Sequence, residues 1–165
     1  MIDTSKKFLV AGAGKSGIGS VNLLLKTGAD VSLYDGNEEL DKEALFEKLY
    51  EKKEISLVLG NITKEDIEKY DLLVLSPGIS VNAPIAQMFY DQEKPVWSEI
   101  ELAYQASKGK IAAITGTNGK TTTTALTGEI MKGYYESSFV VGNIGIPYTS
   151  VALDTQENSV ITAEI

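Results

Sequence analysis

The chain has 165 residues, 43% of them hydrophobic, with a formal net charge of −8 and no cysteine or histidine. This length and apolar content are enough to bury the core of one domain, or of one domain and part of another. The missing residue types exclude disulfides, thiolate chemistry and imidazole catalysis within these residues, and the acidic balance argues against nucleic acid as a general partner.

The first apolar run, at residues 8–11, is short and soon broken by glycines. The apolar part of a signal peptide needs about 7–15 residues, and a membrane-spanning helix needs about 20. We therefore expect no signal peptide, no membrane insertion and a cytoplasmic location.

The first hundred residues alternate short apolar runs with segments of helical spacing. Strands are predicted at 8–11, 31–34, 56–60, 72–75 and 95–97. Helices are predicted after Gly17, at 40–50, from Thr63, from Pro84 to Tyr90, and from a Ser98–Glu101 capping box to Ala106. This alternation is typical of a Rossmann-like, doubly wound parallel sheet.

The same alternation restarts at residue 111. Strands are predicted near 111–114, 138–141 and 160–164, and a helix opens at Lys120. The polar stretch 107–110 suggests a boundary, which gives domains at 1–108 and 109–165. Because the second domain has few strands, we expect it to be the beginning of a P-loop-type α/β domain, cut short.

The first glycine loop, 12–17, reads Gly-Ala-Gly-Lys-Ser-Gly and follows a predicted strand, and Asp35 ends the next strand. G-x-G-x-x-G in this context is the pattern of a dinucleotide site. The residues alone leave three interpretations open: a nicotinamide or flavin cofactor, another nucleotide, or tight packing of the loop against its own helix.

The second glycine loop, 115–119, lies between a predicted strand and a helix opened by Lys120 and Thr121. Loop N–H groups, a lysine ammonium and a hydroxyl are the groups that bind phosphates and Mg²⁺. A strict Walker A motif would have glycine at position 114, where isoleucine stands, so this loop is a variant. A plain glycine turn with an exposed lysine is the alternative.

The stretch 116–122, Gly-Thr-Asn-Gly-Lys-Thr-Thr, resembles the phosphate loop of Mur ligases and the related folylpolyglutamate synthases. Three further stretches strengthen the resemblance to Mur ligases, and it covers essentially the whole chain. They are Ser-Pro-Gly-Ile at 76–79, Ser-Glu-Ile-Glu-Leu-Ala at 98–103 and Gly-Asn-Ile-Gly at 142–145. The member that the chain resembles most adds D-glutamate to UDP-N-acetylmuramoyl-L-alanine.

The resemblance assigns the first glycine loop to the UDP part of this substrate in place of NAD. By position, Lys15, Ser16 and Gly17 would meet the diphosphate, Asp35 and Gly36 the uracil region, and Gly78 the opposite side of the cleft. Ser16 as a helix cap and Asp35 as a strand end are the structural alternatives.

In the second domain the resemblance implies ATP and Mg²⁺ as cofactors. The residues that would hold the ATP phosphates are Gly116, Thr117, Asn118, Gly119, Lys120, Thr121 and Thr122. Thr121 and Glu164, at the end of the last predicted strand, would be magnesium ligands, and Lys120, Asn143 and Glu164 the catalytic residues. Asn143 would contact substrate, or it is a turn asparagine between two glycines.

The implied reaction begins when the L-alanyl carboxylate takes the γ-phosphoryl group of ATP to give an acyl phosphate, which the amine of D-glutamate then attacks. UDP-N-acetylmuramoyl-L-alanine and D-glutamate are thus the expected partners. Because the family uses further residues and a further domain, we expect this segment alone to be inactive, and we expect a monomer.

Two other classes and one sibling remain alternatives. A nicotinamide-dependent oxidoreductase would use the first glycine loop and leave Lys120 unexplained, whereas a P-loop switch would leave residues 12–17 unexplained. A Mur ligase with another amino acid would use both loops.

Overall fold

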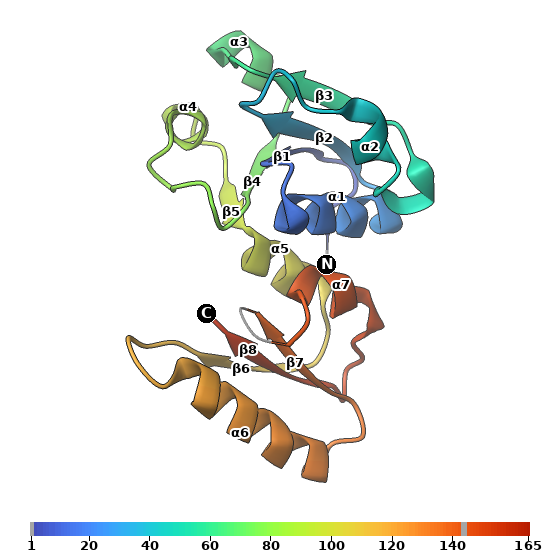
Figure 1. The fold of residues 1–165 in the computed structure, drawn as a ribbon, viewed down its shortest axis with the longest axis vertical. Coiled ribbons are helices and arrows are strands. Elements are labelled where there is room, and N and C mark those ends of the chain that lie inside the picture. The colour runs from blue at the N-terminus through green and yellow to red at the C-terminus, as the bar shows by residue number, and fades with distance from the viewer. Residues whose placement is uncertain (1, 143–144) are drawn as a thin grey trace. The chain divides into compact units, whose positions relative to one another are not determined.

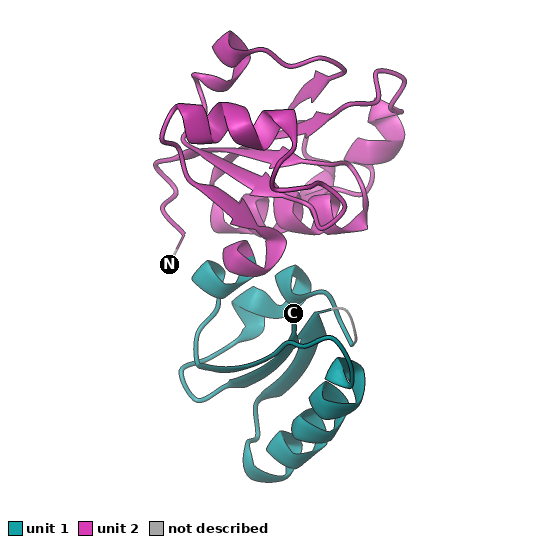
Figure 2. Ribbon diagram, turned by 90° about the vertical axis from the view of Figure 1, so that its left-hand side faces the viewer, with its two compact units in different colours: residues 1, 103–165 teal, residues 2–102 magenta. Residues whose placement is uncertain are grey.

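The computed structural model describes residues 2–142 and 145–165. The chain forms two compact units, residues 2–102 and residues 103–165, which are shown in different colours in Figure 2. Each unit contains one sheet whose strands are all parallel, with helices between the strands (Figure 1). The α/β class predicted from the sequence is therefore confirmed.

The sheet of the first unit has the strand order β3-β2-β1-β4-β5. Its strands are β1 (Lys7–Ala11), β2 (Asp30–Asp35), β3 (Ser56–Leu59), β4 (Leu72–Leu75) and β5 (Val96–Ser98). All five predicted strands are present, each displaced by at most one residue at either end. In this order the connections run to opposite sides of β1, so β1 and β4 flank the point where the chain reverses direction across the sheet.

Helices cover both faces of this sheet. The helices of residues 2–102 are α1 (Lys15–Thr27), α2 (Lys42–Phe46), α3 (Lys64–Ile67), α4 (Pro84–Asp91) and the start of α5 (Glu99–Ala106), with a short 3₁₀ segment η1 (Tyr50–Lys52). On one face, Leu9 and Leu73 pack into a buried cluster with Ile67 of α3 and Phe89 of α4. Because side chains alternate along a strand, Phe8 and its neighbours on β4 face the other side, where α1 contacts β1 and β2.

The predicted helix at 40–50 is shorter than expected. The structure has α2 only at Lys42–Phe46, and the chain then turns into η1. Asn22 of α1 explains the change, because its side-chain amide donates to the carbonyl of Lys48 at 3.1 Å and accepts from the N–H of Tyr50 at 2.6 Å. Asn22 is 26 positions from Lys48 and 28 positions from Tyr50 in the sequence. Two long-range hydrogen bonds thus replace the local helical pattern.

The second unit has a three-stranded parallel sheet in the order β6-β8-β7. Its elements are β6 (Lys110–Ile114), α6 (Lys120–Tyr134), β7 (Ser138–Gly142), α7 (Tyr148–Val151), η2 (Ala152–Asp154) and β8 (Val160–Glu164). The central strand β8 is buried along its whole length, and α6 packs against β7 and β8. The three strands and α6 were predicted, but α7 and η2 were not.

Residues 107 and 108 form hydrogen bonds with later residues of the second unit. The Ser107 and Tyr148 hydroxyls are 2.6 Å apart, and the N–H of Lys108 donates to the Thr155 hydroxyl at 2.8 Å. The compact units accordingly divide at 102/103, within α5. The predicted functional domains, 1–108 and 109–165, remain a proposal.

Candidate functional site

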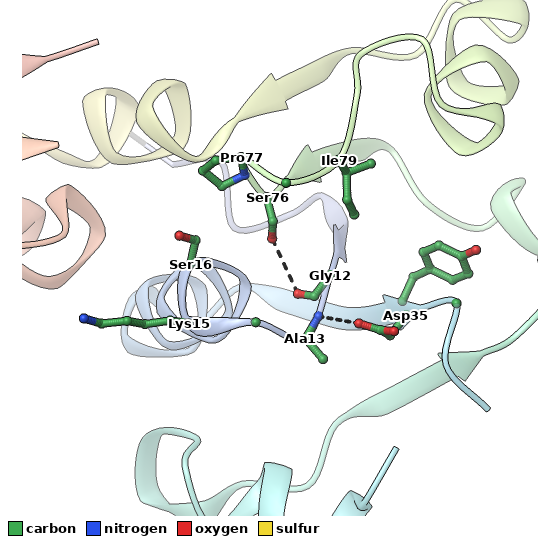
Figure 3. A pocket seen from close by; sticks show the side chains of 12 residues that line it. Gly12, Ala13, Lys15, Ser16, Asp35, Ser76, Pro77 and Ile79 are labelled. Carbon is green, nitrogen blue, oxygen red and sulfur yellow. Dashed lines mark hydrogen bonds between the residues drawn. The ribbon is translucent and has the colours of Figure 1, made fainter. Parts of the chain in front are cut away.

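A cavity lies at the carboxyl edge of the first sheet, where the loops after β1, β2 and β4 meet (Figure 3). In open α/β sheets, ligands bind in the crevice at the point where the strand order reverses, which here lies between β1 and β4. The cavity has a volume of about 470 Å³ and is lined by Gly12, Ala13, Gly14, Lys15, Ser16, Tyr34, Asp35, Gly36, Ser76, Pro77, Gly78 and Ile79. Five of the six described residues predicted to bind UDP line this cavity, namely Lys15, Ser16, Asp35, Gly36 and Gly78.

Gly17, the sixth, has a different position. It is buried in α1 and does not line the cavity. A Cβ atom on Gly17 would overlap the carbonyl oxygen of Gly12 and would lie 2.9 Å from the Ser76 hydroxyl. The absence of a side chain at Gly17 lets α1 pack against the loop. The contact of Gly17 with diphosphate stays a prediction.

The N-terminus of α1 opens towards the cavity without a cap from its own chain. The N-cap residue, Gly14, has no side chain with which to cap the helix, and the first turn contains no acidic residue. The first N–H groups of a helix have no intrahelical acceptor and carry a partial positive charge. Lys15, which is exposed, adds a full positive charge at the same end. This arrangement favours an anion such as a phosphate group.

Side chains from β2 and from the residue after β4 hold the first glycine loop. The carboxylate of Asp35 accepts hydrogen bonds from the N–H of Ala13 at 2.7 Å and of Asn37 at 2.9 Å, and the Ser76 hydroxyl donates to the carbonyl of Gly12 at 3.5 Å. Figure 3 shows the bonds of Asp35 to Ala13 and of Ser76 to Gly12. Ser76 belongs to the 76–79 motif but was not itself predicted as a site residue, and neither was Tyr34, which also lines the cavity.

The second glycine loop follows β6 and precedes α6. Residues 115–119 are all exposed, and Gly119 is the N-cap of α6 with a φ of 76°. As in α1, the structure gives α6 no side-chain cap, and its first turn has no acidic residue. Lys120 and Thr121 are its first two residues. The order of strand, glycine loop and helix predicted for a phosphate loop is present.

Glu164 ends β8, beside the strand that leads into this loop. It pairs in register with Ile114 of β6 on one side and with Gly142 of β7 on the other. Glu164 is 4% exposed, and its Oε2 atom has no hydrogen-bond partner within the described part of the chain. Gly142 has a φ of 110°, and a Cβ atom there would overlap the carbonyl oxygen of Glu164. Glycine is therefore needed where β7 meets Glu164.

The remaining predicted features concern Asn143, metal binding and membrane insertion. Asn143 lies outside the described residues. Residues 2–142 and 145–165 contain no cluster of three or more acidic side chains that could hold a metal ion by themselves. No helix in these ranges is both long and apolar enough to cross a bilayer.

Comparison with solved structures identifies the fold. A pseudomurein peptide ligase type C from Methanothermus fervidus matches 97% of this chain with 33% of its own, at a TM-score of 0.53 and 22% identity. A murein peptide ligase from Psychrobacter arcticus matches 96% of the chain with 37% of its own, at a TM-score of 0.53 and 17% identity. The chain therefore has the α/β fold found in peptide ligases of this type.

The sequence gives the family. The family model "Mur ligase MurD-like, N-terminal domain" matches residues 6–98, and the chain belongs to this family. Curated relatives called UDP-N-acetylmuramoylalanine–D-glutamate ligase include proteins from Lachnospira eligens, 53% identical over 98% of the chain, and from Lachnoclostridium phytofermentans, 51% identical over 97%. The chain spans only 36% and 35% of these two relatives, respectively.

Proposed function

We propose that this chain supplies the UDP-substrate site and the ATP phosphate loop of a ligase that adds D-glutamate to UDP-N-acetylmuramoyl-L-alanine. The observation that carries the proposal is geometric: each glycine loop connects the carboxyl end of a parallel strand to a helix without a side-chain cap. Two separate anion sites in one chain fit an enzyme with two nucleotide substrates. A single-site oxidoreductase or a single-site switch needs only one of them.

The cavity at the first loop would bind the UDP moiety. Lys15, Ser16 and the uncapped end of α1 would bind the diphosphate, and Asp35, Gly36 and Gly78 would surround the uridine. Gly17 would contribute to the diphosphate site by letting α1 pack closely against the loop. The identity of 53% to a relative with D-glutamate in its name supports this amino acid over those used by sibling ligases.

The second loop would bind ATP. The amides of Gly116, Thr117, Asn118 and Gly119 would surround the phosphates, Lys120 would neutralise the terminal ones, and Thr121 and Thr122 would add hydroxyl contacts. The buried Oε2 of Glu164, which has no partner within the described residues, and the Thr121 hydroxyl are hard oxygen donors of the kind that Mg²⁺ prefers. Magnesium bound there would neutralise charge on the phosphates.

The reaction that this site would support has two steps. A carboxylate oxygen of the L-alanyl group attacks the γ-phosphorus, the bond to the bridging oxygen breaks, and ADP leaves. The D-glutamate amine then attacks the acyl carbon, phosphate leaves, and the amine loses a proton. Positioning and charge neutralisation by Lys120 and the loop amides are the main contributions of this chain, and Asn143 would contact the substrate.

We place this reaction in the cytoplasm because ATP and UDP-linked precursors are cytoplasmic nucleotides, and we propose that the protein is a monomer that does not bind nucleic acid. The formal charge of −8 supports the last point, since it repels phosphate backbones.

A thermal-shift experiment on the 165-residue chain tests the substrate assignment. UDP-N-acetylmuramoyl-L-alanine should raise the melting temperature, with about 2.7 kcal/mol of stabilisation at 100 times its Kd, and NAD should not. Lys15→Ala should reduce the shift, whereas Lys42→Ala, which removes an exposed lysine that does not line the cavity, should leave it unchanged. Stabilisation by NAD alone would refute the assignment.

A further inference from the structure

We propose that Asp35 and Ser76 are positioning residues that together clamp one peptide group, the one joining Gly12 to Ala13. The clamp would hold the loop amides that bind the diphosphate, so Asp35 would support phosphate binding through the loop, besides its place beside the uridine. This inference rests on the proposed UDP site and names the residues that keep that site in its binding shape.

The two contacts grip opposite ends of the same group. The Asp35 carboxylate accepts from the N–H of Ala13 at 2.7 Å, and the Ser76 hydroxyl donates to the carbonyl of Gly12 at 3.5 Å. In a trans peptide the N–H and C=O groups lie in one rigid plane and point in opposite directions. Holding both ends therefore fixes the orientation of the plane, and with it the direction in which the loop enters α1.

The loop needs such a restraint because its own conformation is permissive. Gly12 has a φ of 98°, a region that glycine enters freely but that other residues rarely adopt. Its N–H is already bonded to the carbonyl of Tyr34 at 2.7 Å, so the peptide between Gly12 and Ala13 is the next group that can rotate. Asp35 follows Tyr34 directly, which places the acceptor beside that peptide.

Charge supports a positioning role for Asp35. A carboxylate beside a bound diphosphate repels it. Asp35 lines the cavity, so its charge would weaken anion binding if it faced the phosphates. Both carboxylate oxygens accept backbone N–H groups, one from Ala13 and one from Asn37. The negative charge is thus directed at backbone dipoles of the loop and of the turn after β2.

Ser76 is held in place by close packing. It is 8% exposed, its N–H donates to the carbonyl of Ala11, and its side chain would lie 3.0 Å from a Cβ on Gly12 and 2.9 Å from one on Gly17. The hydroxyl is therefore confined beside Gly12. Because its bond is longer than that of Asp35, we expect it to contribute less.

Asp71 provides a matched control. Its carboxylate accepts from the N–H of Lys7 at 2.8 Å, so it makes the same kind of bond at the opposite end of β1. Asp71→Ala removes a backbone-bonded carboxylate from the same unit without changing the cavity. Asp35→Asn is the conservative variant, because its amide has one acceptor oxygen for the two N–H groups that Asp35 serves.

The experiment measures ligand binding to the 165-residue chain by NMR titration, with UDP and with inorganic diphosphate as probes. Asp35→Ala should weaken the binding of diphosphate about tenfold and the binding of UDP at least as much, because the loop amides contact the phosphates in both cases. Ser76→Ala should weaken both about threefold. Asp35→Asn should recover part of the loss, and Asp71→Ala should bind as the wild type does.

The Ala13 amide gives an independent readout. Its proton should exchange with solvent at least about tenfold faster in Asp35→Ala than in the wild type, while the Asp71→Ala rate stays unchanged. A wild-type chain that binds neither probe would contradict the proposed function, and the exchange rate would still decide the clamp. Weakened binding of UDP but not of diphosphate, unchanged binding of both, or an unchanged Ala13 exchange rate would overturn the clamp.

Discussion

The two glycine loops look alike in sequence, but their glycines serve different physical needs. In the first loop, Cβ atoms on Gly12 and Gly17 would come against Ser76 or the loop backbone, so glycine is required for packing. In the second, a Cβ on Gly119 would meet nothing within 4 Å, and residues 115–119 are all exposed. The first loop is thus a preformed surface held by its neighbours, and the second is an open loop with room for a ligand close to its backbone.

The largest expected effect comes from the cation of each loop. In a full-length ligase that contains this chain, Lys120→Ala should lower kcat roughly 10²- to 10³-fold, because it removes charge neutralisation from the reacting phosphates. Lys15→Ala should raise KM for UDP-N-acetylmuramoyl-L-alanine about tenfold with kcat nearly unchanged, because the UDP moiety does not react. Steady-state assays of phosphate release separate the two patterns, and equal effects on kcat would remove the distinction between the loops.

Alanine substitution of the glycines tests the packing difference. Gly17→Ala should destabilise the first unit by about 3 kcal/mol, because the new methyl group would overlap the Gly12 carbonyl. Gly119→Ala should cost the second unit only about 1 kcal/mol, the usual penalty for a side chain at positive φ.

Urea unfolding can be followed separately in the two units. Trp97, the single tryptophan, lies on β5, so its fluorescence reports on the first unit, and far-UV circular dichroism reports on both. Gly17→Ala should move the fluorescence transition and Gly119→Ala should not. A normal Trp97 transition in Gly17→Ala would mean that α1 can move away from the loop at little cost.

The smallest expected effect concerns Tyr148, which anchors residue 107 in the second unit. Burial raises the pKa of the Tyr148 hydroxyl above its usual value near 10, and the hydrogen bond with Ser107 partly opposes this shift. The unfolded chain therefore loses this proton first as the pH rises. The stability that Tyr148 contributes is complete below pH 10 and is lost as the pH rises through the folded-state pKa.

Tyr148→Phe should cost about 1 kcal/mol at pH 8, from the lost hydrogen bond, and should make the second unit less sensitive to pH above 10. Urea unfolding by circular dichroism at pH 8 and pH 10.5 measures both effects. An identical loss of stability with pH in the variant and the wild type would assign the alkaline sensitivity to other tyrosines.

Local patterns were sufficient to predict the strands and the two loops, because buried parallel strands are short apolar runs and glycine turns follow them directly. Long-range side-chain contacts could not be predicted. The amide of Asn22 that ends the helical stretch before residue 48, and the carboxylate of Asp35 that holds Ala13, act across 22 residues or more.

In the candidate site, too, some residues could be predicted from the sequence and others could not. The glycine pattern predicted a site at residues 12–17 with Asp35, and the family resemblance added Gly78 on the opposite side of the cleft. All but Gly17 of the residues predicted to bind UDP there line one cavity. The sequence did not predict that Tyr34 lines the cavity. Alternation along a strand shows which face of the sheet a side chain lies on, but it does not show whether neighbouring segments cover that side chain. The packing role of Gly17 likewise depends on where Gly12 and Ser76 lie in space.

The most direct test of the central proposal is phosphate release from ATP by a full-length ligase that contains this chain, measured with each substrate omitted in turn. The proposal predicts sustained release only when UDP-N-acetylmuramoyl-L-alanine, D-glutamate and Mg²⁺ are all present, and its loss in Lys120→Ala. Release at the same rate without the UDP-linked substrate, or undiminished ligation by Lys120→Ala, would contradict it.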